Sequence, residues 1–307
     1  MIAAERLAKT FGDVVAVEGV SFTVARGEVV GFLGPNGAGK TTTLRMLAGV
    51  FPPTGGRATI DGHDLTTAPL AARRRLGYAP ERPALHGDMT VHRQLEFAAA
   101  MRDAPRPRAA VAPVLERLGL TTVAHRRIRT LSKGFRQRVG LAVALAGAPP
   151  ALLLDEPLAG LDPAQSAEAR TLVRELGRTH AVLVSSHQLA DVEHMCDRVV
   201  ILHRGRVLAC DTPAALEAQL RPAARIDVEA LAPLEALAAA LGAVPGVARV
   251  EPLASRDDRA RCRVEVVPGR EIRPALAAAV AAQGWGLVTL APIETHLEEA
   301  FLALVQQ

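Results

Sequence analysis

The apolar positions in the first two thirds of the chain fall into short continuous runs. Such runs fill Val29–Leu33, Ala151–Leu154 and Ala181–Val184. A continuous apolar run of this length is typical of a strand that is buried on both faces. After the first run, Leu44 and Leu47 repeat with helical spacing and predict a helix. The pattern therefore predicts an α/β domain with a buried sheet.

Two further helices are predicted between the first and the second of these runs. One covers Val91–Met101 and the other Ala109–Leu118, with Pro105 and Pro107 between them. Proline removes a backbone donor and interrupts a helix, so the two helices are separate elements. Residues 83–130 are therefore expected to be helical.

Beyond Arg221 the pattern restarts, with a composition richer in alanine and valine. The predicted elements are strands at 225–230, 247–251, 262–267 and 287–290, and helices at 234–241, 272–283 and 297–305. The order strand, helix, strand, strand, helix, strand is that of a ferredoxin-like α+β domain. We therefore expect two domains, residues 1–221 and residues 222–307.

The composition limits the partners and the compartment that are expected for these domains. The net charge of +4 is spread over the chain and balanced by 32 acidic residues, and aromatic residues make up 3% of the sequence. A stacking surface for single-stranded nucleic acid is therefore not expected, and no nucleic-acid partner is predicted. Cys196, Cys210 and Cys262 lie far apart, which favours free thiols in a reducing compartment.

The longest apolar stretch does not predict a membrane span. Val139–Leu154 is interrupted by Pro149 and Pro150 and runs into Asp155 and Glu156, whereas a span needs about 20 apolar residues. The first residues carry charges and no hydrophobic signal segment. The expected location is the cytoplasm.

A glycine-rich loop follows the first apolar run. It matches the phosphate-loop pattern G-x-x-x-x-G-K-[ST] and consists of Gly34, Pro35, Asn36, Gly37, Ala38, Gly39, Lys40 and Thr41, with Thr42 next. Strand, glycine loop and helix are the context in which backbone N–H groups bind phosphate oxygens. Lys40 is expected to reach the β- and γ-phosphates of ATP, and the Thr41 hydroxyl to bind Mg²⁺.

Two acidic residues end the second apolar run. Asp155 is expected to hold Mg²⁺ through its water shell, and Glu156 to polarise an attacking water as general base. Upstream, Ser132 precedes a run of good helix formers and predicts a helix cap with a second anion site.

In this order, the phosphate loop, Leu131-Ser132-Lys133-Gly134 and Leu154-Asp155-Glu156-Pro157 resemble the nucleotide-binding domain of ABC ATPases. The resemblance covers about residues 1–221. It implies a P-loop NTPase core of the ABC type, with an antiparallel β subdomain and a helical subdomain over about residues 83–148.

Three further segments fit the resemblance. Asp162 lies in a segment similar to the family's D-loop, His187 occupies the place of the switch histidine that contacts the γ-phosphate, and Phe11 that of the aromatic residue that stacks on adenine. The resemblance also implies a dimer, in which Ser132 and Gly134 of a second copy, or of a paralogous ATPase, close over the γ-phosphate.

The chain departs from the family pattern at two places. The usual Gly-Gly-Gln after the signature serine is Lys133-Gly134-Phe135 here, which adds a cation beside the anion site. Two interpretations stay open: the Lys133 ammonium strengthens the attraction of phosphate, or it points to solvent. Glu81 stands where many members have a glutamine that touches Mg²⁺ and senses the membrane subunit. A carboxylate is also an oxygen ligand, so Glu81 is expected to keep both functions, the contact with Mg²⁺ and the sensing of the membrane subunit.

The ending from Pro292 to Phe301 resembles the tail of ATPases paired with type-2 ABC exporters, including the gliding-motility and copper-site-assembly groups. The predicted function is thus the ATP-binding and ATP-hydrolysing subunit of an exporter, peripheral on the inner face of the cell membrane through a separate permease. Two alternatives are a soluble ABC ATPase acting on ribosomes or DNA and a phosphate-loop kinase. The C-terminal domain is either a regulatory or dimerising module or a stabilising appendage.

Overall fold

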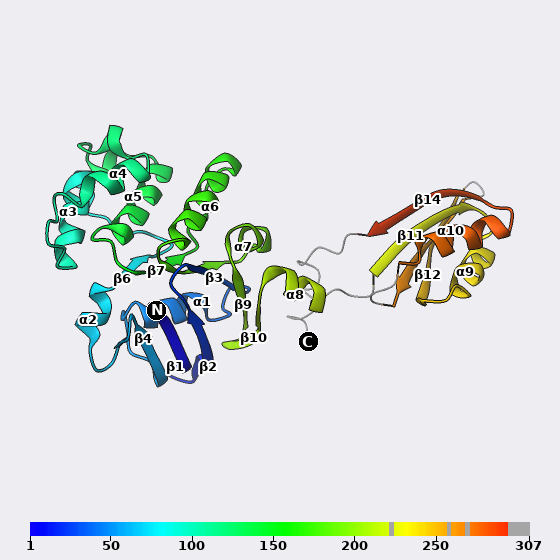
Figure 1. Cartoon of the computed structure of the whole chain (residues 1–307), viewed down its shortest axis with the longest axis horizontal. Helices are drawn as coiled ribbons and strands as arrows, with labels where there is room; N and C mark the ends of the chain where they lie inside the picture. Colours follow the sequence, from blue (N-terminus) through cyan, green and yellow to red (C-terminus); the bar gives the residue numbers. More distant parts are fainter. Residues whose placement is uncertain (221–223, 257–258, 268–270, 294–307) are drawn as a thin grey trace. The chain divides into compact units, whose positions relative to one another are not determined.

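The computed structural model describes residues 1–220, 224–256, 259–267 and 271–293 (Figure 1). The chain divides into two compact units, residues 1–213 and residues 214–307. The boundary predicted from composition, after Arg221, lies further along the chain and outside the described residues. A short helix, α8 (Pro213–Leu220), begins at the division.

A six-stranded sheet forms the centre of the first unit. Its strand order is β10-β9-β3-β8-β7-β6, and all neighbours are parallel except β9 and β10. The strands are β3 (Glu28–Leu33), β6 (Leu76–Ala79), β7 (Ala151–Asp155), β8 (Ala181–Ser186), β9 (Arg198–His203) and β10 (Arg206–Asp211). The three apolar runs form β3, β7 and β8, which lie side by side, so their carboxyl ends meet at one edge of the sheet.

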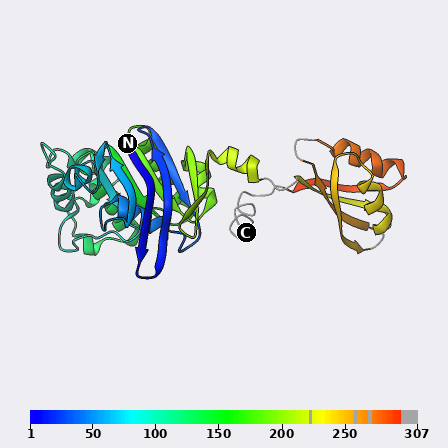
Figure 2. The same cartoon turned by 90° about the horizontal axis from the view of Figure 1, so that it is seen from below.

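A second, antiparallel sheet packs against this centre. Its order is β2-β1-β4-β5, from β1 (Ile2–Phe11), β2 (Val14–Val24), β4 (Gly55–Ile60) and β5 (His63–Asp64) (Figure 2). One core joins the two sheets, because the rings of Phe22 and Phe32 meet edge to face at 4.8 Å. Helix α1 (Lys40–Leu47) lies in the same core, which fixes the loop that precedes it.

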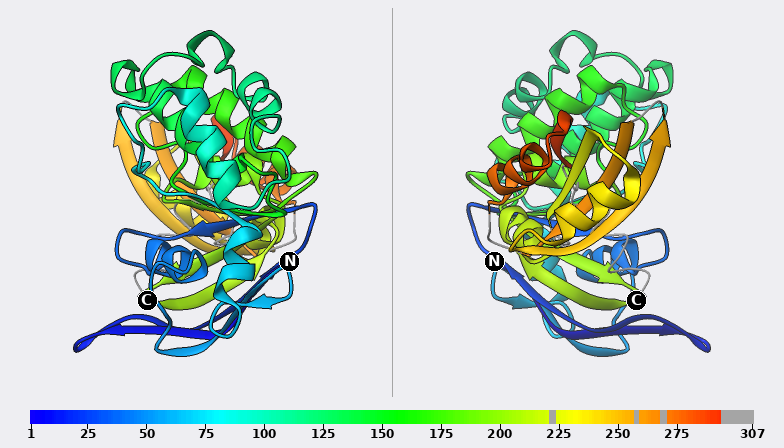
Figure 3. Two further views of the ribbon diagram at one scale, coloured as in Figure 1. Left: turned by 90° about the vertical axis from the view of Figure 1, so that its left-hand side faces the viewer. Right: turned by 90° about the vertical axis from the view of Figure 1, so that its right-hand side faces the viewer.

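The remaining helices of the first unit are α2 (Pro69–Arg74), α3 (Val91–Met101), α4 (Val111–Arg117), α5 (Lys133–Leu145), α6 (Pro163–Gly177) and α7 (Leu189–Met195). Two 3₁₀ turns, Thr121–Val123 and Ile128–Thr130, separate α4 from α5. Helices α3, α4 and α5 group at the end of this unit that lies away from the antiparallel sheet (Figures 1 and 3).

Arg102 ties these helices to the sheet. Its guanidinium donates hydrogen bonds to the carbonyl oxygens of Leu76 in β6 and of Val143 and Ala146 at the end of α5, at 3.1, 2.9 and 2.9 Å. Burial lowers the pKa of Arg102 to about 10. Helix ends and a strand end thus share one cation, which satisfies carbonyls that would otherwise lack partners.

The second unit contains β11 (Ala224–Leu231), α9 (Leu234–Gly242), β12 (Val247–Arg256), β13 (Arg259–Val266), α10 (Arg273–Ala282) and β14 (Gly286–Ile293). Its four strands form an antiparallel sheet in the order β12-β13-β11-β14, as in ferredoxin-like folds. Strand β12 is longer than predicted, because the ladder shifts register between Pro252 and Ala254 and an edge strand tolerates a proline there. The predicted helix at 297–305 lies outside the described residues.

The two faces of this sheet differ in chemistry. Val228, Cys262 and Val264 point into a core with α9 and α10. On the other face, the buried carboxylate of Asp227 accepts hydrogen bonds from Arg261 and Arg263. Burial raises the pKa of Asp227, but the hydrogen bonds from the two arginines outweigh it, and the pKa lies below its usual value.

None of the helices formed by the described residues is long and apolar enough to cross a membrane.

Candidate active site

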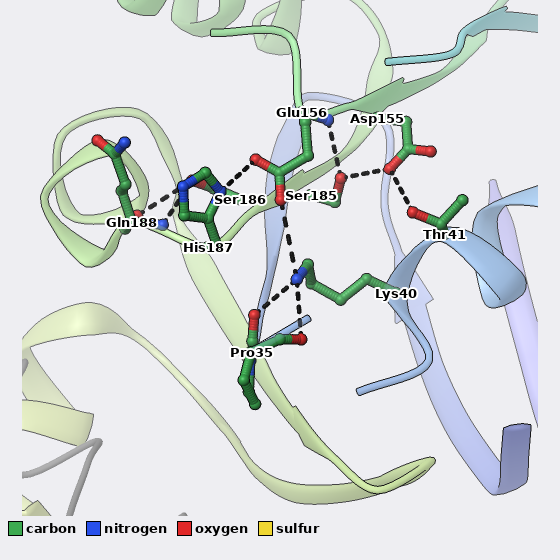
Figure 4. A network of polar contacts seen from close by, with 10 residues as sticks. Pro35, Lys40, Thr41, Asp155, Glu156, Ser185, Ser186, His187 and Gln188 are labelled. Atoms are coloured by element: carbon green, nitrogen blue, oxygen red, sulfur yellow. Dashed lines mark hydrogen bonds and ion pairs between the residues drawn. The ribbon is translucent and has the colours of Figure 1, made fainter. Parts of the chain in front are cut away.

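The glycine-rich loop joins β3 to α1 at the carboxyl edge of the central sheet (Figure 4). Gly37 and Gly39 have φ values of +82° and +102°, a region where other residues are strained. A Cβ atom on Gly34 would collide with the carbonyl oxygen of Leu202. The loop conformation therefore depends on glycine at these three positions, and α1 begins at Lys40 directly after it.

Lys40 is buried at the base of this loop. Its Nζ donates hydrogen bonds to the carbonyl oxygens of Gly34 and Pro35, at 2.6 and 3.2 Å, and lies 3.8 Å from Oε1 of Glu156. Burial lowers the pKa of the ammonium, and the charges of Glu156 and Asp155 oppose this shift. The sheet edge thus holds a cation in a loop suited to phosphate oxygens.

Asp155, at the end of β7, is 1% exposed. Its Oδ1 accepts hydrogen bonds from the Thr41 hydroxyl at 3.1 Å and from the Ser185 hydroxyl at 2.8 Å. Burial raises the pKa of this carboxyl, and the two hydrogen bonds oppose the shift. A buried carboxyl beside a threonine hydroxyl, both on the loop edge, is a donor set that suits a hard cation.

Glu156 follows with an unusual backbone, because its φ is +48° although it is not glycine. Its amide donates to the Ser185 hydroxyl at 2.9 Å, and its Oε2 lies 2.8 Å from Nδ1 of His187. The carboxylate therefore lies between Lys40 and His187 (Figure 4). A carboxylate held between two nitrogen groups is oriented for proton or water chemistry.

The His187 loop is ordered by its own hydrogen bonds. The Ser186 hydroxyl accepts from the Gln188 amide at 3.0 Å and donates to the Gln188 carbonyl at 3.2 Å. The His187 side chain is about half exposed, at 49%. The imidazole thus reaches Glu156 from a loop that its two neighbours fix.

The structure brings five of the predicted residues together: Lys40, Thr41, Asp155, Glu156 and His187. Ser185 joins them, although sequence reasoning assigned it no role. The feature that indicates a role for Ser185 is the strand register, because Ser185 in β8 pairs directly with Asp155 in β7. That register depends on a strand order which the sequence does not display.

Other predicted residues are not part of this cluster. Phe11 is 47% exposed, and its ring meets that of Phe51 at 5.4 Å. Glu81 is exposed and forms no hydrogen bond or ion pair within the part of the chain that the structure describes. Ser132 caps α5 and Asp162 caps α6, each through a backbone amide of its own helix. Their predicted roles therefore require a ligand or a second chain.

The family pattern described as "ABC transporter" matches residues 17–159. "Linearmycin resistance ATP-binding protein LnrL" of Bacillus subtilis (strain 168) is 32% identical over 307 residues, which cover 99% of this chain and 98% of that protein.

Two solved structures are also similar. "Structure of ATP binding subunit of ABC transporter" has a TM-score of 0.66 and 32% identity, and the match covers 71% of this chain and 92% of that one. "Dimeric Structure of MJ0796, a Bacterial ABC Transporter Cassette" has a TM-score of 0.63 and 25% identity, covering 69% of this chain and 99% of that one. With a relative matched along nearly its whole length, the chain belongs to the ABC transporter family, as an ATP-binding subunit with ATPase activity.

Proposed function

We propose that the polar cluster at the carboxyl edge of the central sheet hydrolyses ATP in the dimer of two such chains, and that hydrolysis drives export through a separate membrane permease. One observation carries the proposal. Lys40 and His187 hold the Glu156 carboxylate from two sides, next to the paired Asp155 and Thr41. Phosphate binding, cation binding and water activation are thus assigned to neighbouring groups.

The phosphates bind along the loop from Gly34 to Thr42. The β- and γ-phosphates are surrounded by the backbone N–H groups of Asn36 to Thr41 and by the N-terminus of α1. Lys40 exchanges its loop carbonyls for phosphate oxygens, which are better partners for a buried ammonium. Phe11 stacks on the adenine, and its exposed ring leaves room for that contact.

Mg²⁺ fits the oxygen atoms of Thr41 and Asp155, which meet at 3.1 Å. Among the described residues no three acidic, histidine or cysteine side chains form a metal cluster. That absence agrees with a cation held by one or two side chains, waters and substrate phosphates. Bound there, Mg²⁺ would supply positive charge beside the transferred phosphoryl group, and Glu81 is a further proposed ligand.

Glu156 orients the attacking water and accepts its proton. The positive φ at this residue turns its side chain away from the path of β7 toward His187. His187 donates a hydrogen bond to the γ-phosphate as charge develops on it. Catalysis consists of positioning and electrostatic stabilisation, without a covalent intermediate.

The second half of the site comes from another chain, either a copy or a paralogue. Ser132, Gly134 and Asp162 lie at the N-termini of α5 and α6, whose free N–H groups favour an anion. The MJ0796 cassette, whose title describes a dimer, has a similar fold. LnrL is named for resistance to linearmycin, which supports export as the direction of transport.

The test is Glu156→Gln, which keeps the shape of the side chain and removes its basicity. ATP binding is expected to persist while turnover falls by roughly 100-fold or more. Exposed Glu193→Gln, in α7, is the matched control and should hydrolyse ATP at the wild-type rate. Wild-type turnover in Glu156→Gln would refute the assignment of the base.

A further inference from the structure

Helices α5 and α6 of the first unit both begin at capped N-termini. Under the proposed function, both N-termini face the nucleotide that is bound by the partner chain. The Ser132 hydroxyl accepts from the Phe135 amide at 3.3 Å at the start of α5. Asp162 accepts from the Gln165 amide at 2.8 Å at the start of α6. Each cap is stabilised within its own helix. The two cap hydrogen bonds therefore do not fix one helix relative to the other.

A cavity of about 380 Å³ is lined by residues of both α5 and α6, together with residues of neighbouring strands and loops. Gln137 and Leu141 line it from α5, and Glu168 and Leu172 from α6. A cavity forfeits the close contacts that would otherwise hold two helices in one arrangement. The relation between the helices therefore depends on side chains that cross the gap.

Three side chains, those of Arg138, Gln165 and Lys133, lie between α5 and the segment formed by α6 and the turn before it. Arg138 in α5 donates to Glu168 in α6 at 2.6 Å. Nearer the caps, a Cβ atom on Gly134 would lie 3.4 Å from the side-chain oxygen of Gln165. The third side chain is that of Lys133, directly after the Ser132 cap.

The end of the Lys133 side chain occupies the space that a side chain at Gly160 would need. A Cβ atom on Gly160 would collide with Nζ of Lys133 and lie 3.2 Å from its Cε. Gly160 has a φ of +73° and lies in a turn where the Leu161 amide donates to the Leu158 carbonyl at 3.2 Å. Within the described residues, Lys133 has no hydrogen bond or ion pair. The Lys133 side chain therefore packs against Gly160 and is not held by an acidic partner among the described residues.

We propose that Lys133 is a positioning residue that links the Ser132 cap of α5 to the Gly160 turn before the Asp162 cap of α6. Both caps then approach the partner chain as one preformed surface, so less conformational entropy is lost when the dimer closes. A long unbranched side chain reaches across the gap, and glycine at position 160 admits it. The inference rests on the proposed function, because only dimer closure uses both caps.

A different role for Lys133 makes a different prediction. If its ammonium bound the γ-phosphate of the partner chain by itself, its contribution would not depend on the residue at position 160. If it acts through the turn, its contribution should vanish once Gly160→Ala has displaced it. A double-mutant cycle separates the two, because residues that act through one contact give non-additive effects.

The experiment measures steady-state ATP hydrolysis by the full chain in wild type, Lys133→Ala, Gly160→Ala and the double variant. We expect Lys133→Ala to raise the half-saturating ATP concentration by roughly 3- to 10-fold, with a smaller change in kcat. In the Gly160→Ala background the same substitution should have an effect below about 1.5-fold. Equal effects in both backgrounds, or no effect in wild type, would overturn the proposal.

Two controls complete the test. Arg174→Ala removes an exposed cation from α6 that has no polar partner among the described residues, and it should not change the half-saturating ATP concentration. Thermal unfolding checks that all variants fold: Lys133 is exposed, and Gly160→Ala is expected to lower the melting temperature because a residue other than glycine is strained at a φ of +73°. If the dimer itself is wrong, wild-type activity per chain will not depend on protein concentration. If only the Lys133 role is wrong, that dependence will remain and the cycle will be additive.

Discussion

Asp155 and Asp227 are both buried aspartates at a sheet, 1% and 5% exposed, but their surroundings differ. Asp155 accepts hydrogen bonds from two neutral hydroxyls, and burial raises its pKa. Asp227 is paired with Arg261 and Arg263, and the net shift of its pKa is downward. Asp155 is thus buried without an ion pair among the described residues, whereas Asp227 forms ion pairs with two arginines.

This difference distinguishes Asp155, a residue of the candidate active site, from Asp227, a residue that stabilises the fold. A buried carboxyl without an ion pair is less stable in its charged form, and a bound metal would relieve that cost. An arginine-paired carboxylate gains nothing from a metal and contributes to the stability of its own unit. The two aspartates therefore predict opposite consequences for the same substitution.

The largest effect is expected for Asp155→Asn. Loss of the negative oxygen beside Thr41 should weaken the cation site and lower Mg²⁺-dependent ATP turnover by roughly 100-fold or more. Steady-state hydrolysis measures it, and Asp227→Asn is the matched control, with a rate close to wild type. Equal loss of activity in the two variants would break the distinction.

A smaller effect is expected for Asp227→Asn on stability. The substitution leaves Arg261 and Arg263 without their carboxylate, but both arginines are partly exposed, at 53% and 31%. The expected loss is therefore about 1 kcal/mol in the free energy of unfolding of the second unit. Chemical denaturation, followed in the second unit, measures it. An unchanged denaturation midpoint would show that the arginine pairs contribute nothing.

The contributions of the two aspartates to stability also depend on pH in opposite ways. Because the pKa of Asp227 is lowered on folding, its contribution to stability is present above the unfolded pKa of about 3.9 and is lost as pH falls through the folded pKa. The pKa of Asp155 is raised, so its contribution is full below the unfolded value and is lost as pH rises through the folded one. At pH 7, Asp155→Asn should therefore stabilise the fold and Asp227→Asn should destabilise it. Thermal unfolding at pH 7 and near pH 4 should show the Asp155 difference shrinking on acidification, whereas the Asp227 difference should remain near pH 4 and be lost only at lower pH.

Much of this arrangement follows from the sequence, because the elements involved carry strong local patterns. The apolar runs fix β3, β7 and β8, and the loop, the acids and the histidine follow directly at their ends. Parallel strands collect such residues at one edge, so Lys40, Asp155 and His187 could be expected to be near one another.

The remainder depends on pairings between distant segments. Ser185 contacts Asp155 because β8 lies beside β7 in register, which no local pattern reveals. The contact of Lys133 with Gly160 depends on how α5 and α6 are placed across a cavity. The length of β12 depends on a register shift at Pro252 that only the partner strand defines.

Completion of the site by a second chain can be tested through the mass of Glu156→Gln in solution. With ATP and Mg²⁺, light scattering should give the mass of two chains, because the variant binds ATP without turning it over. Without nucleotide it should give the mass of one chain. A single-chain mass at every ATP concentration, with wild-type hydrolysis per chain independent of protein concentration, would contradict the account.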